Sequence, residues 1–191
     1  MRDASEEAMK IDPNNTWRKV EERLKHEVRP RLRRNLETVL AHMKAETASD
    51  LDGLMATITT KREPHYHAYG TDDPVLNPKG RDAVRQFYAA FVASGAVKLE
   101  LDVDRLVVDE NSVITEGTMK MAYPGNLLRL MGHTVPDPDA FYLFQTRMCI
   151  VWPLDEDGLV IGEDTYSAGD GFAGIAGRRL GPGDIEPLKA V

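Results

Sequence analysis

The periodicity of the apolar residues changes once along the chain, and this change constrains the fold more than any other feature. Up to Phe91, apolar residues recur at the spacing of one helix face. From Val97 to Val103, apolar residues alternate strictly with charged ones, which predicts a half-buried strand. Further strand-like segments follow at 112–121, 141–152 and 159–167. Helices that precede a run of strands indicate an α+β fold.

The part before this change is predicted to be mainly helical. Apolar residues fall at helical spacing over residues 17–28, 32–43, 51–58 and 84–91. Pro64 and the aromatic residues that follow it predict one strand between the third and fourth helices. A curved antiparallel sheet wrapped against these helices would form a cone-shaped α+β barrel with one open end.

The length of 191 residues favours one domain with extensions at both ends. We expect a leader and an extra helix over residues 1–31, the domain over 32–168, and a Gly/Pro-rich tail over 169–191. The N-terminus is polar and acidic, so no signal peptide is expected. No apolar run approaches the length of a membrane span, and we therefore expect a cytoplasmic protein that does not bind membranes.

Charge and cysteine content exclude several classes of function. A net charge of −7 argues against a nucleic-acid binder. The single cysteine, Cys149, permits no intrachain disulfide and fits a reducing compartment. No glycine-rich loop follows a strand, so no nucleotide cofactor is expected. His65 and His67 could bind a metal from one strand face, but no third ligand stands out, and we expect no metal.

Aromatic residues are dense between residues 63 and 91, in the predicted strand and in the helix after it. Such a strand beside an aromatic helix face commonly lines a pocket for a small molecule. Alternation turns Met119 and Met121 inward, where their flexible side chains suit an irregular hydrophobic ligand. The candidate substrate-binding residues are Tyr66, Tyr88, Phe91, Met119, Met121, Phe144, Trp152 and Tyr166.

Several local motifs point to a known superfamily. They are the segments 49–53 (SDLDG), 80–84 (GRDAV) and 112–117 (SVITEG). Together with the order of the elements, they make residues 32–167 resemble the SnoaL-like branch of the nuclear transport factor 2-like superfamily. The resemblance implies a cone-shaped fold and a homodimer formed through the outer face of the sheet. The superfamily includes isomerases, dehydratases, epoxide hydrolases, polyketide cyclases and non-catalytic binding modules, so the fold alone does not give the function.

The resemblance also suggests site residues. Tyr88 matches a tyrosine of the ketosteroid isomerases, but the strand that holds their general base has no acid here after Glu63. Limonene-epoxide hydrolase has an arginine and an aspartate at the positions of Gly117 and Met119, and both are lost. Its second catalytic aspartate matches Asp164.

Asp164 is therefore expected to point into the cone, together with Gly162 and Tyr166, while Glu163 and Thr165 point away. Burial would raise the pKa of Asp164 into a range useful for acid–base catalysis, with His67 as its partner. The alternative is that Asp164 only hydrogen-bonds a tyrosine and shapes the cavity.

Two functions remain open from the sequence. The first is a cofactor-independent enzyme that acts on a small hydrophobic molecule as an isomerase, cyclase, dehydratase or hydrolase. The second is a non-catalytic ligand-binding or dimerisation module of the same fold.

Overall fold

The computed structural model describes residues 9–96 and 98–189. Its helices are η1 (Pro13–Asn15), α2 (Arg18–Leu24), α3 (Pro30–Thr47), α4 (Leu51–Thr57), α5 (Arg81–Ser94), α6 (Gly125–Leu130) and η2 (Ile175–Gly177). Its strands are β1 (His65–Ala68), β2 (Leu99–Val108), β3 (Ser112–Pro124), β4 (Phe141–Pro153) and β5 (Gly162–Ala168). The predicted α+β class is confirmed. Val97, which the alternating pattern included, lies outside the described residues, as do the first eight residues of the expected leader.

The strands form one sheet in the order β1-β5-β4-β3-β2. The last four strands in sequence form an antiparallel meander, as the alternating segments predicted. β1 differs, because it pairs with β5 in parallel at the edge of the sheet. That pairing brings residues 65–68 beside residues 162–165, almost a hundred positions later in the chain.

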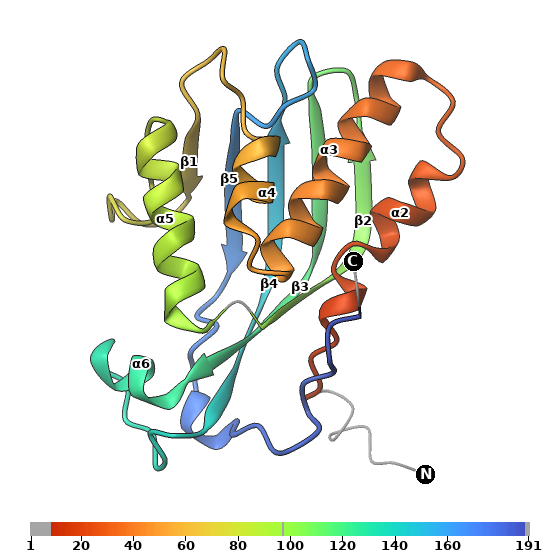
Figure 1. Cartoon of the computed structure of the whole chain (residues 1–191). Coiled ribbons are helices and arrows are strands. Elements are labelled where there is room, and N and C mark those ends of the chain that lie inside the picture. Colours follow the sequence, from red (N-terminus) through yellow and green to blue (C-terminus); the bar gives the residue numbers. More distant parts are fainter. Residues whose placement is uncertain (1–8, 97, 190–191) are drawn as a thin grey trace.

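Helices α3, α4 and α5 cover one face of the sheet, and α6 lies where β3 ends and β4 begins (Figure 1). The apolar stripe of α3 is buried in the core, with Leu36 and Val39 fully enclosed. From α5, Val84 and Tyr88 reach the same core, which Trp152 of β4 completes from the sheet. The space left between the helices and the sheet holds the cavity described below.

Local sequence signals explain where the long helices begin and end. Pro30 occupies the first turn of α3, where its fixed backbone angle is favourable and no hydrogen bond is lost. The helix expected over residues 17–28 stops at Leu24, and Val28 is 86% exposed in the linker before α3. Helix α5 ends at Gly95, whose φ of 74° is easily adopted only without a side chain.

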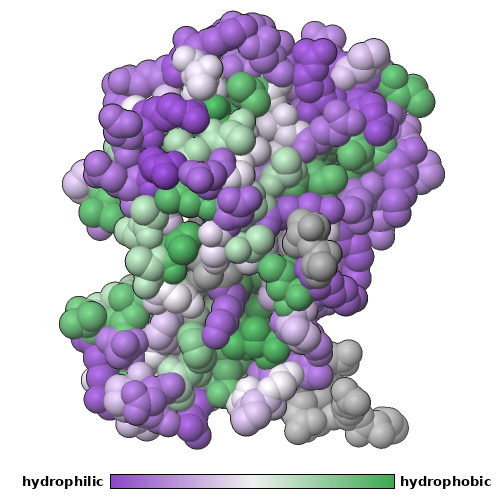
Figure 2. Space-filling view, in the orientation of Figure 1, coloured by the Kyte–Doolittle hydropathy of each residue, from purple (hydrophilic) through white to green (hydrophobic). Residues whose placement is uncertain are grey.

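The chain outside the sheet and helices is packed against them. The Ile11 amide donates to the Asp184 carbonyl, and the Glu186 amide donates back to the Ile11 carbonyl, so the two ends lie side by side. Ile175 and Leu180 of the expected tail are buried. Apolar side chains also gather on the surface around α6 (Figure 2), where Leu130 is 86% exposed. The boundaries proposed after residues 31 and 168 stay predictions.

None of the helices within residues 9–96 and 98–189 is long and apolar enough to cross a membrane.

Candidate active site

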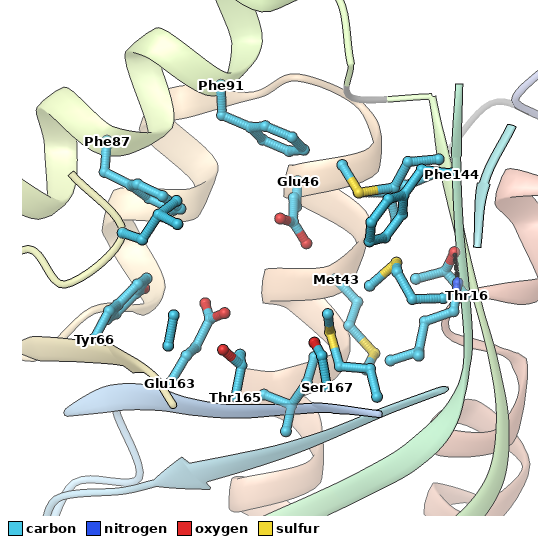
Figure 3. A pocket seen from close by; sticks show the side chains of 18 of the residues that line it. Thr16, Met43, Glu46, Tyr66, Phe87, Phe91, Phe144, Glu163, Thr165 and Ser167 are labelled. Carbon is cyan, nitrogen blue, oxygen red and sulfur yellow. Dashed lines mark hydrogen bonds between the residues drawn. The ribbon is translucent and has the colours of Figure 1, made fainter. Parts of the chain in front are cut away.

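A cavity of about 320 Å³ lies between the sheet and helices α3 and α5. Its wall is mainly aromatic, aliphatic and methionine side chains, and no lysine or arginine lines it. The acidic side chains in the wall are Glu46 from α3 and Glu163 from β5. Figure 3 shows both carboxyl groups pointing into the open space. A cavity that is mostly apolar with a few convergent polar groups is typical of a small-molecule site.

The orientation of β5 corrects the sequence-based prediction. Glu163, Thr165 and Ser167 line the cavity, and Asp164 and Tyr166 do not. The register explains this, because Glu163 pairs with the inward-facing Tyr66 of β1, whereas Asp164 pairs with the exposed His67. Gly162 begins β5 and pairs closely with His65 of β1, because an added Cβ would come within 1.9 Å of the His65 carbonyl oxygen.

Glu163 is held by buried groups that the other elements provide. The Tyr88 hydroxyl donates to Glu163 Oε1, and the Tyr66 hydroxyl lies 2.8 Å from the Tyr88 hydroxyl. His42, which is completely buried on α3, places Nε2 2.8 Å from the same Tyr88 hydroxyl and 3.2 Å from Glu163 Oε1. The carboxylate therefore sits at one end of a closed network of hydrogen-bonding groups, with its other side open to the cavity.

The tautomer of His42 can be assigned from its second contact. Thr57 Oγ1 donates its hydrogen to the Leu54 carbonyl, at 2.7 Å. The same oxygen lies 2.7 Å from His42 Nδ1, so Nδ1 carries a hydrogen and donates it to Thr57. This arrangement leaves His42 Nε2 as the atom that faces Tyr88 and Glu163.

Two positions of a single proton satisfy this network. In the first, Nε2 of His42 is protonated and Tyr88 donates to the ionised Glu163 carboxylate. In the second, Tyr88 donates to a neutral His42, and a protonated Glu163 donates to Tyr88. Passing from one to the other moves one proton between Glu163 and His42 through the Tyr88 hydroxyl. The hydrogen-bonding groups thus form a continuous chain from His42 through Tyr88 to the Glu163 carboxyl group at the cavity.

Burial sets the protonation of the remaining groups. Burial, reinforced by the negative charge of Glu163, raises the pKa of Glu46 to about 8. The same two causes, in the same order, hold the pKa values of Tyr66 and Tyr88 well above their ordinary range. Near neutral pH, Glu46 is therefore mainly a neutral carboxylic acid, and both tyrosines are hydrogen-bond donors.

A family model, described as the SnoaL-like domain, matches residues 39–162. The chain belongs to the SnoaL-like domain family. Solved structures show the same fold at low identity. An epoxide hydrolase of Mycobacterium tuberculosis, described as LEH-like, has 19% identity and a TM-score of 0.57, over 76% of this chain and 92% of that one. A putative SnoaL-like polyketide cyclase from Jannaschia has 19% identity and a TM-score of 0.54. The match covers 74% of this chain and 90% of that one.

A third similar structure is SalBIII, an epoxide hydrolase/cyclase-like enzyme with a role in pyran ring formation in the polyether salinomycin. It has 14% identity and a TM-score of 0.51, over 70% of this chain and 90% of that one. No curated protein matches the sequence.

Most of the substrate-binding residues predicted for this SnoaL-like chain do meet at the cavity. The wall includes Tyr66, Phe91, Met119, Met121, Phe144 and Trp152. Tyr88 lies one layer deeper, behind Glu163. Tyr166 does not join them, because β5 turns it to the outer face of the sheet, where it stacks on Tyr69 with ring centroids 4.1 Å apart.

Of the predicted catalytic pair, His67 touches the cavity and Asp164 does not. His67 reaches the edge of the cavity, but its side chain is exposed, and its ring packs 4.2 Å from that of Tyr69. Asp164 is its partner across the two strands, on the same outer face. The two residues are neighbours, as the pairing hypothesis requires, but Asp164 cannot reach a ligand in the cone.

Sequence reasoning did not single out Glu46 or His42, and it expected Glu163 to point away from the cavity. One signal was present: His42 and Glu46 are four residues apart, at the spacing that puts polar groups on one helix face. Among the residues that the structure describes, no group of three or more His, Cys, Asp or Glu side chains is placed to hold a metal ion.

Proposed function

We propose that this SnoaL-like protein is a cofactor-independent enzyme that transfers protons on a small hydrophobic molecule. The observation that carries this proposal is the position of Glu163. Its carboxylate faces an apolar cavity while Tyr88 and His42 contact it from behind. A base in such a place meets its substrate with little competing water and can dispose of the proton it removes.

The roles follow from the network. When the network lacks this shared proton, Glu163 accepts one from the substrate and passes it through Tyr88 to the unprotonated Nε2 of His42. Glu46, neutral near physiological pH, supplies a proton at the other side of the cavity. A base and an acid that face one bound molecule support isomerisation, cyclisation, dehydration or opening of a strained ring.

Among these reactions, a cyclase or isomerase fits better than an epoxide hydrolase of the limonene type. The arginine of limonene-epoxide hydrolase corresponds to Gly117 in this chain. Even a Cβ there would lie 2.1 Å from the Asp102 carbonyl oxygen, so this backbone has no room for an arginine side chain. One of the similar structures is a putative polyketide cyclase, which supports a cyclase reaction here. The alternative is a non-catalytic binding module, which the largely apolar wall of the cavity would equally serve.

A generic proton-transfer substrate separates these alternatives without knowledge of the natural one. In 5-nitrobenzisoxazole, removal of the ring C–H proton by a base breaks the N–O bond and releases a coloured phenolate. We expect the protein to accelerate this reaction, and Glu163→Gln to lower the rate by about a hundredfold or more.

Asp164→Asn is the matched control, since it removes the neighbouring carboxylate, which faces away from the cavity. We expect it to leave the rate within about twofold of the wild type. A wild-type rate no higher than that of Glu163→Gln would favour the binding module instead.

We also propose a homodimer formed through the outer face of the sheet, in a cytoplasmic protein. Tyr69, Tyr166 and Val107 lie on this face with 47%, 43% and 48% of their surfaces exposed, which favours a partner surface there. The single Cys149 fits a reducing compartment. A monomer in light scattering at micromolar concentration would contradict the dimer.

A further inference from the structure

The two carboxyl groups of the cavity differ in their hydrogen-bond partners. Glu163 has Tyr88 and His42 as partners. The carboxyl group of Glu46 points into the cavity, and among the described residues no side chain or backbone group hydrogen-bonds to it. No lysine or arginine lines the cavity. A carboxyl group in an apolar cavity is costly to ionise without a partner, and a cation is the partner that would favour its ionised form most.

The wall around Glu46 suits a cation in a second way. Phe91 projects from α5 toward the same space as the Glu46 carboxyl (Figure 3). Phe87, Tyr66 and Trp152 add further ring surfaces to the wall. Aromatic faces attract cations that have been removed from water, and they do not attract anions.

We propose that the molecule bound in this cavity is a lipophilic amine, a hydrophobic skeleton whose protonated nitrogen lies between Glu46 and Glu163. This inference names the ligand class for the cavity of the proposed function and rests on that cavity being the functional site. The aromatic and methionine wall receives the skeleton, and the carboxyl groups receive the ammonium group. Carboxylates, phosphates and other anions are disfavoured, because they would face two carboxyl groups in a wall without lysine or arginine.

Binding of an ammonium group changes the protonation of Glu46. Glu46 faces Glu163 on β5, Tyr66 on β1, Tyr88 on α5 and His42 on its own helix. Burial and Glu163 raise the pKa of Glu46 to about 8, so the empty site keeps its proton near neutral pH. An ammonium beside it favours the carboxylate, and the proton is released to solvent.

Compounds that share one skeleton and differ in the head group test the inference. We choose 1-adamantanemethylamine, 1-adamantanemethanol and 1-adamantanecarboxylate, and measure their binding by calorimetry near neutral pH. The amine is expected to bind at least about tenfold more tightly than the alcohol, with the carboxylate weakest. Titrations in buffers of different ionisation enthalpy are expected to show proton release with the amine and none with the alcohol.

Glu46→Gln is expected to remove both the preference for the amine and the proton release. Glu37→Gln, on the exposed side of the same helix, is the control and is expected to behave as the wild type. Equal affinity for amine and alcohol, or no binding of either, would overturn the inference.

The outcome is separable from that of the proposed function. The benzisoxazole assay uses a neutral substrate and depends on Glu163, so proton transfer can be present when the amine preference is absent. Proton transfer can equally be absent from a protein that binds the amine through Glu46.

Discussion

Nε2 of His42 lies 3.2 Å from Oε1 of Glu163, so a helix from the first quarter of the chain and the last strand meet at one point. The histidine is completely buried, and the glutamate side chain keeps 14% of its exposure, on the side of the cavity. The Tyr88 hydroxyl contacts both residues. The three side chains form a hydrogen-bonded group in which Glu163 lines the cavity and His42 and Tyr88 lie behind it. The predictions below test the parts of this arrangement separately.

Removal of the Tyr88 hydroxyl should break the hydrogen-bonded connection between His42 and Glu163. Tyr88→Phe keeps the ring that fills the core but leaves His42 Nε2 and the Glu163 oxygen without their shared partner. Because buried polar groups are then unsatisfied, we expect the free energy of unfolding to fall by about 1–3 kcal/mol in urea denaturation. The same variant should slow benzisoxazole opening about tenfold or more, since the proton relay is interrupted.

Tyr69→Phe is the control for that variant, because Tyr69 is 47% exposed on the outer face of the sheet. It should change the unfolding free energy by no more than about 0.5 kcal/mol. If the two substitutions had equal effects, the hydroxyl of Tyr88 would have no special role.

Thr57 should fix the tautomer of His42. In the wild type, the nitrogen chemical shifts of His42 are expected to show a hydrogen on Nδ1. Thr57→Val keeps the shape of the side chain and removes the oxygen that accepts this hydrogen. We expect the preference for the Nδ1 tautomer to weaken and the pH profile of benzisoxazole opening to shift. A spectrum and a pH profile identical to those of the wild type would show that Thr57 does not position His42.

Glu46 should make stability depend on pH. Its pKa is about 8 in the folded protein, against an ordinary value of 4.5, so the folded state binds the proton more tightly. Stability is therefore full at or below the ordinary value and decreases as the pH rises from there to about 8. We expect a loss of a few kcal/mol across this window in the wild type, measured by urea denaturation.

Glu46→Gln cannot lose a proton, and its stability should vary less with pH over the same window. Glu37→Gln should keep the wild-type dependence. If Glu46→Gln kept the full dependence on pH, another group would have to account for it.

The sequence predicted the layers of the fold more fully than the site. The alternation of β3 turned Met119 and Met121 inward, and the structure agrees, because Glu116 and Lys120 make the opposite face of that strand charged. Segment 162–168 of β5 is polar on both faces, so alternation showed which residues share a face but not which face is inside. Asp164 was chosen on resemblance, and the structure turns its side chain away from the cavity instead of into it.

The missing information was a contact between distant parts of the chain. Tyr66 and Glu163 face inward together because β1 pairs with β5 in parallel, and the sequence left open which face of β1 enters the cone. His42 was similarly hidden, since its role depends on Thr57, Tyr88 and Glu163 meeting around it. Such contacts have no local pattern that periodicity could reveal.

Gly117 gives a test of the sheet that holds the cavity wall. It lies where the register of β2 and β3 shifts between Val103 and Arg105, and an added Cβ would come within 2.1 Å of the Asp102 carbonyl oxygen. The obstructing atom is backbone, so the strands must separate, and Gly117→Ala should lower the unfolding free energy by about 2 kcal/mol or more. Gly177→Ala is the matched control: no heavy atom lies within 4 Å of its added Cβ, and the change should stay within about 0.5 kcal/mol. Equal stability of both variants in urea denaturation would mean that the close approach of β2 to Gly117 is not required by the fold, and that a larger residue there is tolerated.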